Sequence, residues 1–122
     1  MARILIVEDE QEIAENLAAL LAAKGHKVET VADGADALPR ARRFAPEVVL
    51  LDVMLPRMSG FDVCKLLRAD PKTAKAKIVM VTGLGRVGDV DTAFASGADD
   101  YLIKPFDSDR LFRKIDKVLA LP

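Results

Sequence analysis

The chain has 122 residues, of which 30% are charged, with a formal net charge of −1 at pH 7 and one cysteine. This length and composition are typical of one globular domain that folds without disulfides or structural metals, and the small net charge argues against direct binding of nucleic acid. One cysteine, together with the lack of an apolar run long enough to cross a bilayer, predicts a cytoplasmic protein with no membrane partner.

Strand-like runs alternate with helical patterns in the first part of the chain. Residues 3–7 form a continuous apolar run rich in β-branched residues, which is typical of a buried parallel strand. Apolar residues then recur at helical spacing up to Gly25, which suits the left-handed end of a helix. Residues 28–32 have the mixed polarity of an edge strand, and Asp33 is placed to cap the next helix.

The same alternation continues to the end of the chain. Residues 48–51 are the most apolar run and end at Asp52, and a helix is expected from about Ser59 to a point before Asp70. The remaining expected elements are a strand over 78–81, a helix that ends at Gly97, a strand over 101–103 and a helix that begins at Asp107 or Ser108.

Five strands that alternate with five helices predict an α/β fold in which residues 1–122 form a single domain. Right-handed crossovers between parallel strands give a doubly wound sheet with helices on both faces. For the flavodoxin-like strand order 2-1-3-4-5, the first and third strands are neighbours at the point where the order reverses. Ligands bind at this point, outside the carboxyl ends of the strands.

Polar side chains of suitable chemistry end four of these strands. Glu8 and Asp9 follow the first strand and Asp52 ends the third, so three carboxylates are expected to share one crevice. Such a group needs a cation, and its hard oxygen ligands suit Mg²⁺. Thr82 and Lys104 follow the fourth and fifth strands and add a hydroxyl and an ammonium group. Together these groups are the parts that stabilise a phosphoryl group in transfer.

Four segments resemble the receiver domain of two-component response regulators, along the whole length of the chain. They are ILIVEDE (residues 4–10), VVLLDVMLPRMSGFDV (48–63), VTG (81–83) and GADDYLIKPF (97–106). The resemblance implies a CheY-like single receiver domain that acts as a phosphorylation-controlled switch. Its phosphoryl donor would be a sensor histidine kinase or a histidine phosphotransfer protein.

The resemblance also implies a role for each residue of the acidic crevice. Asp52 would be the phosphoacceptor. Asp9, Asp52 and the backbone carbonyl of Met54 would hold Mg²⁺, and Glu8 would act through a metal-bound water. Glu8 stands where many members have Asp, and its longer side chain places direct metal contact in doubt.

The switch residues implied by the resemblance lie on the last two strands. Lys104, joined to Pro105 by a cis peptide bond, would contact the phosphoryl oxygens. Thr82 would shift toward the new phosphate and Tyr101 would turn inward, which would rearrange the face formed by helix four, strand five and helix five.

That rearranged face would bind a downstream protein target or an output domain missing from this chain, and a dimer that forms only after phosphorylation is a further expectation. Basic residues of the last helix lie opposite its apolar stripe, where they are either solvated or contact a partner; they are Arg110, Arg113, Lys114 and Lys117. Met54 and Leu84 are apolar where some members carry groups that help water attack the phosphate. We therefore expect slow intrinsic dephosphorylation.

Glycines after the fourth strand form G-x-G-x-x-G at Gly83, Gly85 and Gly88, the pattern of a dinucleotide site. That site belongs after a first strand and needs an acidic residue at the end of the next strand, where this chain has Lys104. We expect no dinucleotide site. Glycine weakens helices, so the fourth helix should begin late or fray, and residues 83–91 should change their order on phosphorylation.

Two other functions are weighed against the signalling switch. A haloacid-dehalogenase-like phosphohydrolase also uses an Asp nucleophile, but it needs a second Asp two positions later as a general acid, and this chain has Met54 there. An unphosphorylated receiver-like binding module would not need the complete set of acidic, hydroxyl and lysine groups. We expect a signalling protein that assists its own phosphorylation and dephosphorylation, not an enzyme acting on other substrates.

Overall fold

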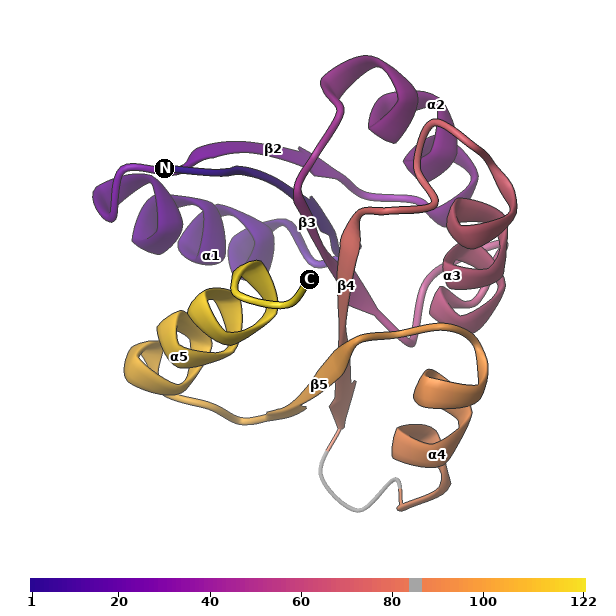
Figure 1. Cartoon of the computed structure of the whole chain (residues 1–122). Coiled ribbons are helices and arrows are strands. Elements are labelled where there is room, and N and C mark those ends of the chain that lie inside the picture. Colours follow the sequence, from indigo (N-terminus) through magenta and orange to yellow (C-terminus); the bar gives the residue numbers. More distant parts are fainter. Residues whose placement is uncertain (84–86) are drawn as a thin grey trace.

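Five parallel strands form the centre of the computed structural model, which describes residues 1–83 and 87–122. The strands are β1 (Arg3–Val7), β2 (Lys27–Val31), β3 (Val48–Asp52), β4 (Lys77–Gly83) and β5 (Asp100–Lys104). The helices are α1 (Gln11–Ala23), α2 (Gly34–Phe44), α3 (Gly60–Ala69), α4 (Val87–Ala95) and α5 (Ser108–Leu119). The strand order is β2-β1-β3-β4-β5, so the predicted flavodoxin-like fold is confirmed (Figure 1).

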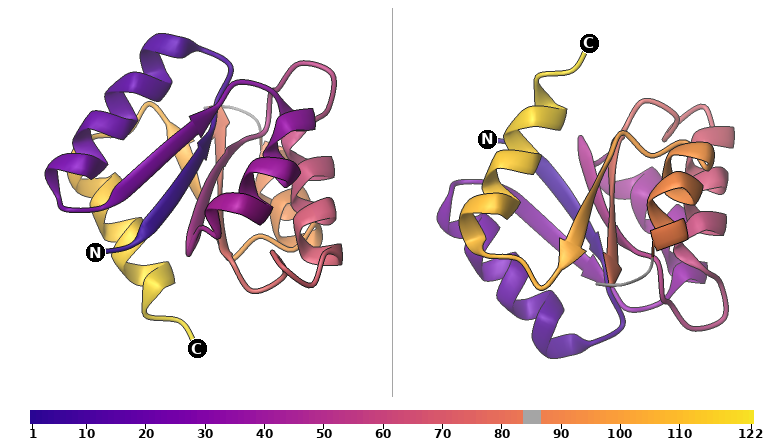
Figure 2. Two further views of the ribbon diagram at one scale, coloured as in Figure 1. Left: turned by 90° about the horizontal axis from the view of Figure 1, so that it is seen from above. Right: turned by 90° about the horizontal axis from the view of Figure 1, so that it is seen from below.

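The helices cover both faces of the sheet, with α1 and α5 on one face and α2, α3 and α4 on the other (Figure 2). Successive strand residues point to opposite faces, so the sheet contributes to two cores. Leu5 and Val7 of β1 pack with α2 and α3, whereas Ile4 and Ile6 pack with α1 and α5. This two-sided burial explains why the central strands are almost continuously apolar.

Local signals set most helix ends where the sequence predicts them. Asp33 caps α2 by accepting a hydrogen bond from the N–H of Ala35 at 2.8 Å, and Asp107 caps α5 in the same way. Gly25 and Gly97 follow α1 and α4 with φ of 90° and 108°, in the left-handed region that glycine adopts without strain.

Strand β4 extends further than the sequence predicts. The apolar run ends at Val81, but Thr82 and Gly83 pair in register with Ile103 and Lys104 of β5. The partner strand therefore continues the ladder past the last apolar residue. Helix α4 begins at Val87. The expectations of a loose helix start and of slow dephosphorylation depend partly on Leu84 and Gly85, and these two residues lie outside the described part of the chain.

No helix in residues 1–83 and 87–122 combines the length and hydrophobicity that a membrane span requires.

The connection from β3 to α3 is tightly packed against the end of β3. The N–H of Gly60 donates a hydrogen bond to the carbonyl oxygen of Val53 at 2.9 Å. A Cβ atom at Gly60 would overlap the backbone carbonyl of Asp52. Only a glycine allows α3 to begin this close to the strand that carries Asp52.

We predict that Gly60→Ala lowers the free energy of unfolding by about 1–3 kcal/mol, because backbone atoms must move to admit the methyl group. Gly88→Ala is the matched control, since a Cβ at Gly88 meets nothing within 4 Å and Ala favours a helix over Gly by about 0.5–1 kcal/mol. Urea unfolding of both variants measures the difference. Equal stabilities would contradict the close approach at Gly60.

Candidate functional site

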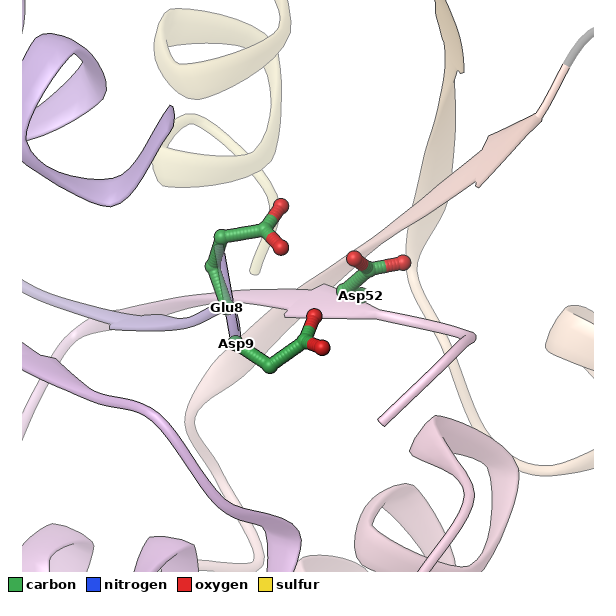
Figure 3. A group of neighbouring side chains, drawn as sticks. All are labelled: Glu8, Asp9 and Asp52. Atoms are coloured by element: carbon green, nitrogen blue, oxygen red, sulfur yellow. The ribbon is translucent and has the colours of Figure 1, made fainter. Parts of the chain in front are cut away.

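The carboxyl ends of β1 and β3 bring three acidic side chains together. Glu8 and Asp9 follow β1 and Asp52 ends β3, and these strands are neighbours in the sheet. One carboxylate oxygen from each residue lies within 4.8 Å of the others, and Figure 3 shows the three groups facing a common space. Glu8 and Asp52 are 3% and 6% exposed, whereas Asp9 is exposed to solvent. The cluster is therefore mostly enclosed but open on the Asp9 side.

Lys104 reaches this cluster from the end of β5. Its Nζ lies 3.1 Å from Oε1 of Glu8 and 3.2 Å from Oδ2 of Asp52, so one ammonium group bridges two buried carboxylates. The peptide bond between Lys104 and Pro105 is cis. Burial lowers the pKa of Lys104, but the attraction of Asp52 and the hydrogen bond to Glu8 outweigh it and raise that pKa above its ordinary value. Lys104 therefore carries its charge at neutral pH.

Glu8 holds its proton more tightly than an ordinary glutamate. Burial is the largest cause, and the neighbouring Asp52 adds to it, while the N–H of Glu10 and the ammonium of Lys104 act in the opposite direction. Together they raise the pKa of Glu8 from 4.5 to about 7. Since one lysine faces three carboxylates among the described residues here, the cluster keeps an excess of negative charge. This excess and the oxygen donors suit a hard divalent cation.

The backbone of Met54 lies beside the cluster. Its N–H donates a hydrogen bond to Oδ1 of Asp52 at 3.1 Å, and its side chain is 60% exposed. The two carboxylate oxygens of Asp52 are thus held separately, one by this N–H and the other by Lys104. Met54 places no acidic or amide group at the mouth of the site.

Thr82 lies buried near the end of β4, one residue beyond Val81, which is the register partner of Asp52. Tyr101 is half-buried near the start of β5, and its ring contacts both Phe94 of α4 and Lys114 of α5. Lys104 and the backbone of Met54 contact the acidic cluster. Tyr101 instead lies on the face formed by α4, β5 and α5.

Asp100 is a buried acid that the sequence analysis did not single out. It pairs with Lys114 and Lys117, each at 3.0 Å, so both lysines have a partner within the chain, while the side chain of Lys117 stays 62% exposed. The spacing of Lys114 and Lys117 on one helical face is compatible with a shared partner. The sequence alone, however, gives no sign that Asp100 at the start of β5 is that partner.

The raised pKa of Glu8 predicts a pH-dependent stability for the metal-free protein. Between about pH 4.5 and 7 the folded state keeps a proton that the unfolded state has released, so the free energy of unfolding falls as pH rises through this range. Glu8→Gln should remove that loss, roughly 1–3 kcal/mol. Urea unfolding in EDTA across the range measures it. Glu12→Gln, at an exposed position of α1, is the control; parallel profiles for wild type and Glu8→Gln would contradict the prediction.

Comparisons with known proteins agree on one family. The response regulator receiver domain matches residues 4–116. The chain is 39% identical, over 98% of its length, to the DNA-binding dual master transcriptional regulator RpaA of Synechocystis sp., and it spans 49% of that protein.

Two solved structures of similar size share the fold. The chemotaxis protein CheY4 of Vibrio cholerae has a TM-score of 0.91 and 32% identity, with 97% of this chain and 98% of that chain covered. The receiver domain of the sensor histidine kinase PA1611 from Pseudomonas aeruginosa, with a magnesium ion coordinated in its active site cleft, has a TM-score of 0.90 and 30% identity over 98% of both chains. The chain belongs to the response regulator receiver domains, which act in phosphorylation-controlled two-component signalling.

Proposed function

We propose that residues 1–122 form one receiver domain whose phosphoacceptor is Asp52. The observation that carries this proposal is the enclosed cluster of Glu8, Asp9 and Asp52, bridged by Lys104. A buried carboxylate with a lysine beside it and an excess of negative charge around it can receive a phosphoryl group only if a cation balances the added charge. The cluster offers the oxygen donors for that cation.

Asp9, Asp52 and the backbone carbonyl of Met54 are proposed to hold Mg²⁺, with Glu8 acting through a bound water. The fit is supported by the donor set, which consists of oxygen atoms, and by the exposed side of the cluster at Asp9. The magnesium ion described for the receiver domain of PA1611 supports the same choice of metal. When bound, Mg²⁺ supplies positive charge to the oxygens of the transferring phosphoryl group.

Asp52, Lys104 and Met54 have separate roles in the proposed phosphoryl transfer. An oxygen of Asp52 attacks the phosphorus of a phosphohistidine, the new O–P bond forms as the P–N bond breaks, and the imidazole leaves with the electron pair. Lys104, which touches Oδ2 of Asp52 before the transfer, is close enough to move to a phosphoryl oxygen. The hydrogen bond from Met54 to Oδ1 keeps the carboxylate oriented during the attack.

The proposed partners follow from this chemistry. The phosphoryl donor is a sensor histidine kinase or a histidine phosphotransfer protein. The response is a shift of Thr82 and an inward turn of Tyr101, which change the face of α4, β5 and α5 for a downstream protein, an output domain or a second phosphorylated copy. The chain assists its own phosphorylation and dephosphorylation without acting on other substrates.

Asp52→Asn tests the site directly. Incubation with Mg²⁺ and acetyl phosphate should add one phosphoryl group to the wild type and none to Asp52→Asn, because the amide cannot act as the nucleophile. Intact-protein mass spectrometry measures the modification. Asp116→Asn, at an exposed position of α5, should behave as the wild type.

Other outcomes of this experiment decide between the alternatives. An unmodified wild type would support a binding module that is not phosphorylated. Modification that persists in Asp52→Asn would place the phosphoacceptor elsewhere. Steady turnover of phosphate esters by the wild type would support the phosphohydrolase.

We further predict a phosphorylated state that lasts minutes or longer, because the exposed Met54 side chain cannot orient a water for attack on the phosphate. Met54→Asn should shorten the lifetime several-fold by supplying a polar group. Leu66→Asn, at an exposed apolar position of α3, should leave it unchanged. The decay of the phosphorylated mass after removal of the donor measures all three, and a wild-type half-life of seconds would contradict the prediction.

A further inference from the structure

A buried carboxylate on β5 fixes the position of two lysines of α5. Asp100 is 3% exposed, and its Oδ1 and Oδ2 lie 3.0 Å from the Nζ atoms of Lys114 and Lys117 respectively. The N–H of Tyr101 also donates a hydrogen bond to Oδ1 at 2.8 Å. A buried charge must be paired, so Asp100 holds at least one of these ammonium groups beside it.

Asp100 is charged at neutral pH. Burial raises the pKa of its carboxyl group, but the N–H of Tyr101 and the ammonium groups of Lys117 and Lys114 outweigh burial and hold that pKa below its ordinary value. Asp100 therefore offers a negative charge to both lysines at neutral pH.

Lys114 makes a second contact that is independent of Asp100. Its Nζ lies 4.8 Å from the centroid of the Tyr101 ring, within the distance of a cation–π interaction. The Tyr101 ring also forms a T-shaped contact with the ring of Phe94, with centroids 5.9 Å apart and an interplanar angle of 88°. The Tyr101 ring thus contacts both α4 and α5, through Phe94, which is 46% exposed, and through the ammonium group of Lys114.

We propose that Lys114, anchored by Asp100, is a positioning residue that retains Tyr101 between α4 and α5 and opposes its inward turn. This inference rests on the proposed role of Tyr101 as the switch residue. If the ring turned inward, Asp100 would keep Lys114 in place and the cation–π contact would be lost. The contact therefore favours the outward position of the ring in the unphosphorylated protein. For a cation–π contact of ordinary strength, the ratio of outward to inward positions rises by about two- to fivefold.

Lys117 provides a matched control within the same network. It pairs with the same carboxylate as Lys114, while the ring contact belongs to Lys114. Lys114→Met and Lys117→Met therefore each remove one partner of Asp100 and keep an unbranched side chain. The difference between them isolates the contact with Tyr101.

The chain itself supplies the probe, because it contains one tyrosine and no tryptophan. Its intrinsic fluorescence reports Tyr101 alone. In the unphosphorylated protein, Lys114→Met should change the emission and its quenching by acrylamide. At a limiting concentration of acetyl phosphate with Mg²⁺, it should raise the phosphorylated fraction relative to the unphosphorylated fraction by about two- to fivefold. Lys117→Met should do neither, and Lys114→Arg should restore the wild-type values because it keeps the cation.

Two results would overturn the proposal. If both Met variants change the tyrosine signal equally, the lysines act only through the charge of Asp100. If Lys114→Met leaves the signal unchanged, the cation does not hold the ring. Lys114→Gln repeats the test if the Met variant fails to fold. The fluorescence arm needs no phosphorylation, so a wild type that cannot be phosphorylated would refute the proposed function without affecting the contact between Lys114 and Tyr101.

Discussion

The charge balance around Asp52 depends on the bridge that Lys104 forms to Glu8 and Asp52. Without this ammonium group, two buried carboxylates would face each other at the end of the sheet, at a high cost in free energy. With it, Glu8 and Asp52 can lie in the same enclosed space, but the three acids of the cluster still exceed the positive charge. The order of the strands makes this arrangement possible, since it places the ends of β1 and β3 side by side and brings β5 within reach of both.

Most of the fold could be predicted because its signals are local. Apolar runs mark the strands, and Asp33 marks a helix start through a hydrogen bond from Ala35. Gly25 and Gly97 mark helix ends through their left-handed backbone. The convergence of Glu8, Asp9 and Asp52 also follows from the sequence, but only through topology. Once five alternating units imply the strand order, the residues at the ends of adjacent strands must meet.

The remaining features depend on partners that are distant in the sequence. Thr82 belongs to β4 because Ile103 of β5 pairs with it, which the polarity of the segment does not indicate. Asp100 would ordinarily be placed at the surface, and its burial is possible only because Lys114 and Lys117 approach from a helix that forms later in the chain. Such contacts arise from packing, so composition and periodicity do not reveal them.

The position of β5 at the margin of the sheet has a mechanical consequence. This strand ends in Lys104, which contacts the acidic cluster, and begins with Asp100 and Tyr101, which contact α5 and α4. It forms a hydrogen-bonded ladder with a single neighbour, β4, whereas β3 is bonded on both sides. A displacement of β5 would therefore strain one ladder instead of two. The segment that joins the acidic cluster to the face of α4, β5 and α5 is thus an edge strand, which can shift with less disturbance to the sheet than β1, β3 or β4.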